Sequence, residues 1–203
     1  MTFLTYYDSN YKNLANITIP ILKKYCEKHN YTFKSRNEPY LAQGRPSSWA
    51  KINAIKEEFE KTSDWIFWID TDAIITNHQT NIRDIIDENY SCIFSPDGSV
   101  WISACCFLMK KTDSSIKLLN KMWDQPNEVI NHCWWENLAL MKVLESDSES
   151  RKTCKIIEYK KIFSQIDDWK KGDFIMHIGG GLRIGEKKTD MINKFLSSNS
   201  IIY

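Results

Sequence analysis

The stretch Asp64-Trp65-Ile66-Phe67-Trp68-Ile69-Asp70-Thr71-Asp72-Ala73 decides the fold. Its apolar and aromatic run has the length of a strand, and such side chains fit a strand that is covered on both faces. The run ends in two carboxylates that are one residue apart. In an open α/β sheet, ligands bind at the carboxyl ends of the strands. Two acidic side chains there predict a site for a hard divalent cation, although a surface turn is the alternative for such a short motif.

The segments before this strand alternate between strands and helices. Residues 2–7 predict a strand, 10–29 an amphipathic helix, 31–34 a second strand and 47–59 a second helix. The resulting β-α-β-α-β order is typical of parallel strands with helices on both faces of the sheet. We therefore expect an α/β protein with a single, mostly parallel and Rossmann-like central sheet.

The rest of the chain continues in the same manner. We expect short helices or strands over residues 82–88, 90–95, 100–109, 112–123, 134–144 and 155–159, a strand from 172 that runs into glycines, and a polar helix from 187. There is no repeat, low-complexity tract or linker in the sequence. A length of 203 residues suits one domain, so we expect residues 1–203 to form a single catalytic domain.

Composition and charge exclude some classes of function. Lys plus Arg number 27 and Asp plus Glu 26, so the formal net charge is +1. This balance argues against nucleic acid as the main partner, because phosphate backbones select a basic face. The chain shows neither a signal peptide nor a segment of membrane-spanning length. Its six cysteines follow no zinc spacing and suit buried free thiols in a reducing compartment, so we expect a cytoplasmic protein of unknown oligomeric state.

A second group of residues with ligand chemistry lies near the carboxyl end. His177 closes an apolar run and precedes Gly179 and Gly180 in a string of three glycines. Imidazole is the commonest nitrogen ligand for a divalent metal, and glycines let a backbone approach an anion closely. Taken alone, His177 suits a core histidine. Together with Asp70 and Asp72, it predicts one metal–diphosphate site.

Several further polar residues are candidates for binding the phosphates or the sugar. Arg183 follows the glycines, and guanidinium groups match phosphate oxygens. Lys51, on the helix after Ser47-Ser48, either reaches a phosphate or is solvated. Thr5, in the first predicted strand, is assigned to the same donor site. Glu136 and Asn137 open a helix after two tryptophans, where acidic residues are also common as partners of the helix dipole.

Several stretches of the sequence resemble sequence blocks of glycosyltransferase family 34, the galactosyl/xylosyl/mannosyl transferases. The resemblance spans about residues 48 to 183, and the matching blocks occur in the family's order. The blocks are Ser48-Trp49-Ala50-Lys51, Trp65 to Ala73, Cys106-Phe107-Leu108-Met109-Lys110, Leu118 to Trp123, Trp135-Glu136-Asn137 and Gly172 to Gly180. One stretch departs from the family, because Ile102-Ser103-Ala104-Cys105 stands where an asparagine-threonine-glycine is common.

The resemblance implies a GT-A fold, a nucleotide-sugar donor, manganese or magnesium as cofactor, and retention of anomeric configuration. By motif position, Asp70 and Asp72 would hold the metal and the donor's ribose–diphosphate, and His177 would be the third ligand. Lys51 and the pair Glu136 and Asn137 would lie near the donor sugar. A UDP-sugar is favoured over a GDP-sugar as donor, with a saccharide or another carbohydrate-type molecule as acceptor.

The chemistry of sugar transfer assigns roles to these groups. Negative charge builds on the leaving phosphate, where a cation stabilises it, and positive charge develops at the sugar carbon. We therefore name Glu136 and Asn137 as candidate catalytic residues, with attack by the acceptor on the departure face as the alternative. Two other functions stay open. One is a HAD-like phosphohydrolase with Asp70 as nucleophile and Asp167-Asp168 as the downstream acidic pair, and the other is a non-catalytic sugar-nucleotide-binding module.

Overall fold

The computed structural model describes residues 1–179 and 185–202. Its strands are β1 (Thr2–Tyr6), β2 (Thr32–Arg36), β3 (Ile66–Ile69), β4 (Ala73–Ile75), β5 (Cys92–Ser95), β6 (Ser103–Met109), β7 (Cys154–Ile156), β8 (Phe163–Gln165) and β9 (Ile175–His177). Its α-helices are α1 (Lys12–Lys28), α2 (Ala50–Phe59), α3 (Asp113–Trp123), α4 (Asn127–Ile130), α5 (Trp135–Ser146), α6 (Ser148–Lys152) and α7 (Gly185–Ser198). Short 3-10 helices cover Ser9–Tyr11, Pro39–Ala42, Ser47–Trp49 and Ile82–Ile85.

Six strands form the central sheet in the order β2-β1-β3-β6-β5-β7. The pairs β1/β2, β1/β3 and β5/β7 are parallel, whereas β6 runs antiparallel to both β3 and β5. The predicted mostly parallel central sheet is therefore confirmed. A second sheet of three strands, in the order β4-β9-β8, was not part of the prediction. Its strands have only three residues each, which is too short for a pattern of alternation to stand out.

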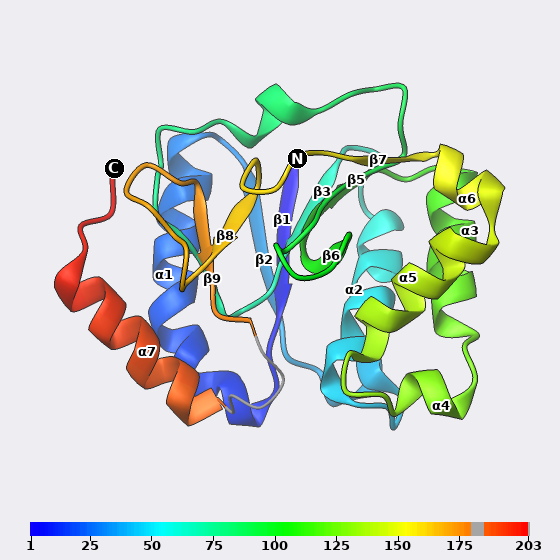
Figure 1. Cartoon of the computed structure of the whole chain (residues 1–203), viewed down its shortest axis with the longest axis horizontal. Coiled ribbons are helices and arrows are strands. Elements are labelled where there is room, and N and C mark those ends of the chain that lie inside the picture. Colours follow the sequence, from blue (N-terminus) through cyan, green and yellow to red (C-terminus); the bar gives the residue numbers. More distant parts are fainter. Residues whose placement is uncertain (180–184, 203) are drawn as a thin grey trace.

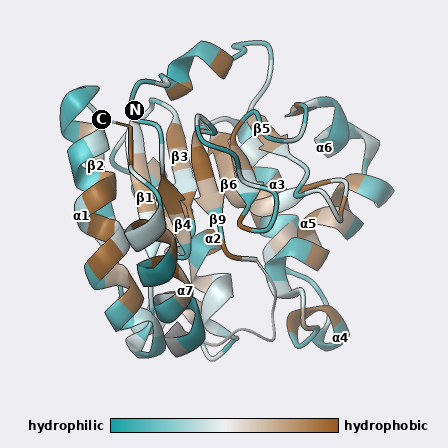
Figure 2. Ribbon diagram, turned by 60° about the vertical axis from the view of Figure 1, so that its left-hand side comes forward, coloured by the Kyte–Doolittle hydropathy of each residue, from teal (hydrophilic) through white to brown (hydrophobic). Residues whose placement is uncertain are grey.

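Helices cover both faces of the central sheet (Figure 1). Helices α1 and α7 lie on the side of the small sheet, and α2, α3 and α5 lie on the opposite side. The apolar β3 run explains this arrangement, because Ile66 and Trp68 enter one core cluster, while Phe67 and Ile69 enter the other. Brown, apolar strands accordingly lie inside the molecule in Figure 2, and teal positions dominate the outer surfaces.

Individual element boundaries follow local chemistry. The predicted start of α3 at Thr112-Asp113 is confirmed by a capping box, in which the Thr112 and Ser115 side chains each accept from the other residue's backbone N–H. Within the described residues, no helix combines the length and the apolar character needed to cross a bilayer.

Candidate active site

The Asp70-Thr71-Asp72 segment is a tight turn that joins β3 to β4. Ala73 N donates to Asp70 O at 3.0 Å and closes the turn. The hydroxyl of Thr71 donates to Tyr6 O at 2.8 Å, and Asp70 N donates to Cys105 O at 2.8 Å. These bonds tie the turn to the ends of β1 and β6, so both carboxylates project from a fixed backbone.

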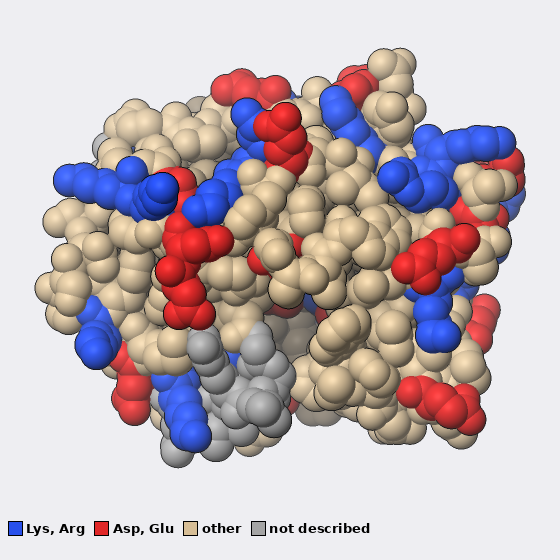
Figure 3. All heavy atoms as spheres, in the orientation of Figure 1, with Lys and Arg blue, Asp and Glu red and all other residues tan. Residues whose placement is uncertain are grey.

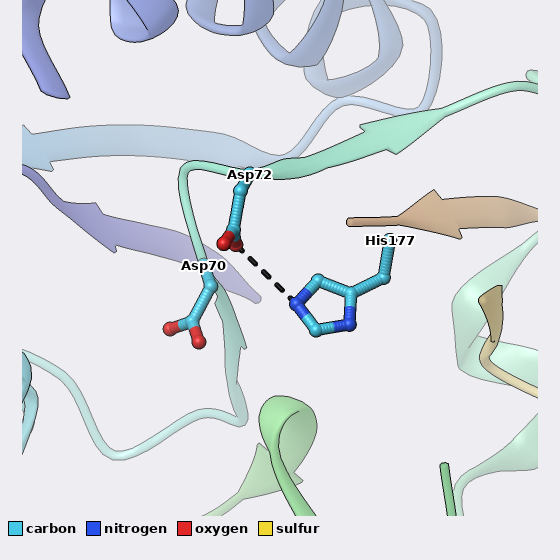
Figure 4. A group of neighbouring side chains, drawn as sticks. All are labelled: Asp70, Asp72 and His177. Atoms are coloured by element: carbon cyan, nitrogen blue, oxygen red, sulfur yellow. Dashed lines mark ion pairs between the residues drawn. The ribbon is translucent and has the colours of Figure 1, made fainter. Parts of the chain in front are cut away.

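The pairing of β4 with β9 brings His177 to this turn. Ala73 lies opposite His177 in the antiparallel ladder, and Ile178 N donates to Asp72 O at 3.0 Å. The His177 Nε2 atom consequently lies 3.4 Å from Asp72 Oδ1. Figure 4 shows the His177 ring and the Asp72 carboxylate pointing toward one another, with Asp70 on the same turn. The sequence-predicted grouping of Asp70, Asp72 and His177 is thus present in the structure.

A neighbouring amide fixes the orientation of the His177 ring. Gln165 is the partner of His177 in the β8–β9 ladder, and its Nε2 lies 3.3 Å from His177 Nδ1. The opposite ring nitrogen, Nε2, is left to face Asp72. Metal-binding histidines are commonly oriented in this way through the ring nitrogen that does not bind the metal.

The three side chains fit a divalent cation. One ligand atom from each of Asp70, Asp72 and His177 can be chosen so that all lie within 4.8 Å of one another. Asp72 Oδ1 is buried and has no hydrogen-bond partner among the described residues, which is the state expected of a ligand atom. Two carboxylates and an imidazole suit Mn²⁺ or Mg²⁺, with further positions left for water or phosphate oxygens.

Lys51 is buried beside Asp70 rather than solvated. Its Nζ lies 3.1 Å from Asp70 Oδ1 and donates to Glu136 Oε1 and Ala104 O, at 2.6 Å each. Burial disfavours an ammonium, but Asp70 and Glu136 outweigh it and raise the pKa of Lys51 above its ordinary value. Lys51 therefore holds a permanent charge that fixes both carboxylates.

The two aspartates have opposite electrostatic environments. Burial and the neighbouring Asp72 carboxylate raise the pKa of Asp70, against the lowering effect of Lys51. Burial would also raise the pKa of Asp72, but Lys188 and His177 together hold this pKa well below its usual range. Asp72 is thus the more firmly ionised of the two carboxylates.

Lys188, on the first turns of α7, is a site residue that the sequence analysis missed. Its Nζ donates to Asp72 Oδ2, and the side chain is 7% exposed. The spacing in the sequence could have indicated it, because Lys188 lies one helical turn before Ile192 and two turns before Phe195. Both of these apolar residues are buried in the structure. A lysine on the apolar face of a helix needs a buried partner.

Glu136 and Asn137 lie at the start of α5 and face the same region. The Glu136 side chain is 7% exposed and bonded to Lys51. Asn137 Oδ1 accepts from Ala104 N at 2.7 Å, so its carbonyl oxygen is engaged with the backbone. The peptide groups around Ala104, in the stretch that departs from the family pattern, are therefore held by Asn137 on one side and Lys51 on the other.

The backbone before Glu136 is strained. Trp135 has φ = +43°, a left-handed conformation that is unusual for a bulky side chain and costs about 1–3 kcal/mol. This turn sends Glu136 into the interior, while Trp134 stays 47% exposed. Strain of this kind persists only where the surrounding structure enforces it.

These residues line a cavity with a volume of about 380 Å³. Its lining includes Asp70, Asp72, Glu136, His177 and Lys188, together with Trp134 at the exposed end. The space-filling view shows a hollow in this face of the molecule, and basic and acidic side chains are interspersed over the surface around it (Figure 3). A cavity of this size and mixed polarity suits a small organic ligand.

The remaining predicted residues have different positions. Gly179 lines the cavity, but its N–H donates to Gln165 Oε1 at 3.1 Å and is therefore engaged. Thr5 is buried, with its hydroxyl 3.2 Å from that of Thr71, so it supports the turn from behind. Gly180 and Arg183 lie outside the described residues.

The acidic pair required by the phosphohydrolase alternative is elsewhere. Asp167 and Asp168 are absent from the described lining of the cavity, and Asp168 Oδ2 accepts from Tyr159 Oη at 2.8 Å. Asp70 itself accepts a hydrogen bond from Trp68 Nε1 at 2.6 Å and contacts Lys51. Among the residues that the structure describes, the acidic pair of this alternative therefore does not line the cavity that holds Asp70.

The fold is that of known sugar transferases. The chain resembles a solved glycosyltransferase involved in the glycosylation of the major capsid of PBCV-1, with a TM-score of 0.70 and 19% identity over 95% of this chain and 98% of that chain. It also resembles Drosophila β1,4-galactosyltransferase 7, solved with manganese, UDP-Gal and xylobiose, with a TM-score of 0.50 and 10% identity over 89% of this chain and 71% of that chain.

The sequence comparisons agree with the fold. Residues 3–91 match the galactosyl transferase GMA12/MNN10 family. The chain therefore has the GT-A fold, and its first half is similar in sequence to this galactosyltransferase family. An uncharacterized α-1,2-galactosyltransferase and an α-1,2-galactosyltransferase, both from Schizosaccharomyces pombe, are 34% identical over 70 residues and 30% identical over 89 residues. These alignments cover 32% and 37% of this chain, and only 18% and 24% of the relatives.

The family match and the geometry support different parts of the site. The matched region, residues 3–91, contains Lys51, Asp70 and Asp72. Glu136 and His177 lie beyond it, and their connection to the site rests on the contacts described above. The predicted family resemblance is confirmed, whereas the role of each site residue stays a prediction.

Proposed function

We propose that this chain is a glycosyltransferase that moves a sugar from a nucleotide-diphosphate sugar to a saccharide or other carbohydrate-type acceptor, with the aid of a divalent cation. The observation that carries the proposal is the convergence of Asp70, Asp72 and His177 in a cavity at the end of β3. The family match of residues 3–91 supports sugar transfer as the reaction. Residues 1–203 would act as one catalytic domain, and the cytoplasmic location stays a prediction from the sequence.

In this proposal Asp70, Asp72 and His177 hold Mn²⁺ or Mg²⁺, which when bound stabilises negative charge on the leaving diphosphate. Lys51 keeps Asp70 in place and balances the charge of Glu136. The carboxylates of Asp70, Asp72 and Glu136, of which the last two are buried, would otherwise repel one another across the cavity. The chain therefore supplies a site whose charges are arranged before any ligand binds.

Glu136 is the better placed of the two candidate catalytic residues. Its carboxylate is in the cavity lining, where it can stabilise positive charge that develops at the sugar carbon. The Asn137 carbonyl oxygen is committed to Ala104 N, so we assign Asn137 to holding the start of β6. Retention of anomeric configuration is our proposal from the family resemblance, with acceptor attack on the departure face as the route.

A UDP-sugar is the proposed donor and manganese the proposed ion. One structural neighbour was solved with manganese and UDP-Gal, and the two curated sequence relatives are named galactosyltransferases. The cavity of about 380 Å³ lies within the range of roughly 300–1,000 Å³ that is common for small-molecule sites. A GDP-sugar is the second candidate donor and has the same diphosphate chemistry.

The test is donor turnover by the purified protein. A panel of UDP- and GDP-sugars is incubated with and without Mn²⁺, and released nucleoside diphosphate is measured. Asp72→Asn is the test variant, and Asp190→Asn, at an exposed position of α7, is the matched control. Metal-dependent release from one donor, lost in Asp72→Asn and kept in the control, supports the proposal. Metal-independent release, or release unchanged in Asp72→Asn, contradicts it, and metal-dependent binding without turnover indicates a binding module.

A further inference from the structure

The ammonium of Lys188 already occupies the carboxylate that the metal site needs. Its Nζ donates to Asp72 Oδ2, while His177 Nε2 faces the other oxygen of the same carboxylate. Both oxygens of Asp72 therefore have a nitrogen neighbour. The Nζ atom of Lys188 also lies over the Tyr11 ring, 5.8 Å from its centre.

Packing holds Lys188 in this place. Helix α7 packs against α1 and the small sheet through an apolar cluster that includes Leu14, Ile74, Met176, Ile192 and Phe195. Ile192 and Phe195 lie on the same face of α7 as Lys188. The helix cannot turn Lys188 toward solvent without exposing this cluster, so a change of partner for the ammonium has to occur inside the cavity.

A divalent ion and the Lys188 ammonium compete for the same carboxylate. A cation coordinated by Asp72 withdraws electron density from the carboxylate and repels a positive charge at contact distance. The released ammonium then needs another anion, because a buried charge without a partner is costly. The Glu136 carboxylate, which lines the same cavity, is already bonded to Lys51. The diphosphate of a bound donor is an anion of the right charge that enters the same cavity.

We propose that Lys188 is a positioning residue that makes the binding of divalent metal and of nucleoside diphosphate interdependent. It neutralises Asp72 in the protein without ligands, and it pairs with the donor's diphosphate once Asp72 holds the ion. The inference rests on the proposed function, since it assumes a metal–diphosphate site. By linkage, the factor by which nucleotide strengthens metal binding equals the factor by which metal strengthens nucleotide binding.

The experiment measures Mn²⁺ binding directly. Free Mn²⁺ is followed by electron paramagnetic resonance as it is titrated into the protein, first alone and then with saturating UDP. The same titrations are made with Lys188→Met and with Lys188→Arg, which keeps a cation. Lys187→Met is the matched control, because Lys187 is the exposed neighbour on the same helix. Circular dichroism and thermal unfolding establish that each variant is folded, and Lys188→Gln replaces Lys188→Met if the latter is not.

Loss of the charge should have two opposite effects. Without UDP, Lys188→Met should bind Mn²⁺ at least roughly tenfold more tightly, because a charge-assisted hydrogen bond no longer competes for Asp72. With saturating Mn²⁺, the same variant should bind UDP several-fold more weakly. The factor by which UDP strengthens Mn²⁺ binding should therefore fall by about tenfold or more. Lys188→Arg and Lys187→Met should stay close to the wild type.

Either of two results overturns the inference. Mn²⁺ affinity in the absence of UDP that is unchanged or lower in Lys188→Met shows that the ammonium does not compete with the ion. A loss of UDP affinity without any gain in Mn²⁺ affinity assigns Lys188 to phosphate binding alone. The proposed function fails separately, if the wild-type protein binds no Mn²⁺ even with UDP, or if Asp72→Asn binds it as well as the wild type.

Discussion

The substitution Lys51→Met tests the charge arrangement at the centre of the site. It replaces a buried ammonium by an apolar side chain of similar length and leaves Asp70 and Glu136 without their shared counter-ion. Removing one partner of a buried ion pair costs about 3–5 kcal/mol, because an uncompensated charge stays buried. Since domains have a total stability of about 5–15 kcal/mol, we expect a large fall in the free energy of unfolding.

The assay is urea unfolding in the presence of EDTA, followed by circular dichroism. Lys61→Met, at an exposed position after α2, is the matched control and should change stability by less than about 0.5 kcal/mol. The double variant Lys51→Met/Glu136→Gln should regain part of the loss, because one of the two unpaired carboxylates is gone. A cost below about 1 kcal/mol for Lys51→Met, or no recovery in the double variant, would refute the reasoning.

The pH dependence supplies an independent check on the same variant. Lys51 lowers the pKa of Asp70, so its removal raises that pKa further. A carboxyl group whose pKa is higher in the folded than in the unfolded state binds more protons in the folded state. It therefore lowers the free energy of unfolding as the pH rises above the pKa that the group has in the unfolded state. The cost of Lys51→Met should be smaller at pH 5 than at pH 8. An equal cost at both values would show that packing, not charge, is the cause.

Three further predictions concern other parts of the chain. Trp134→Ala should raise the KM for the acceptor several-fold, because the exposed indole lies at the cavity rim. Release of nucleoside diphosphate in the absence of an acceptor should not change. A KM for the acceptor equal to that of the wild type would contradict this prediction. Burial lowers the pKa of His78 from 6.5 to about 4. The neutral His78 ring therefore contributes up to about 3 kcal/mol to the free energy of unfolding above pH 6.5, and this contribution is lost as the pH falls toward 4. His78→Phe should therefore lose less stability than the wild type between pH 7 and pH 4.5 in urea titrations, and parallel losses would count against this origin. Thr112→Ala should lower the free energy of unfolding by about 1 kcal/mol, since it removes the capping box of α3, with Thr80→Ala as the comparison outside a helix.

Much of the site could be predicted from local sequence. The apolar run before Asp70 and Asp72 sets a buried strand with a polar end, and this end is where the structure has its cavity. His177 was found because an apolar run and glycines surround it. What joins these segments, the β4–β9 ladder, was not predictable, because three-residue strands carry no measurable periodicity.

The partners of the two lysines needed tertiary structure. Lys51 lies on the same face of α2 as Ala54 and Ile55, which are buried, so a buried partner could have been expected, but not which one. Its carboxylates come from positions 19 and 85 residues away in the chain. Lys188 was missed for the same reason, since its helix is polar overall and only the face toward α1 is apolar.

The two aspartates of the motif are attached to different sheets. Asp70 follows the last residue of β3 in the central sheet, and Asp72 precedes the first residue of β4 in the small sheet. The spacing of the two carboxylates therefore depends on how closely the sheets approach, which is set by the apolar cluster that joins Ile69 of the central sheet to Ile75 and Ile175 of the small sheet. Because Mg²⁺ requires shorter and more regular oxygen contacts than Ca²⁺, ion preference in this protein should be adjustable through its core, at positions that never touch the ion.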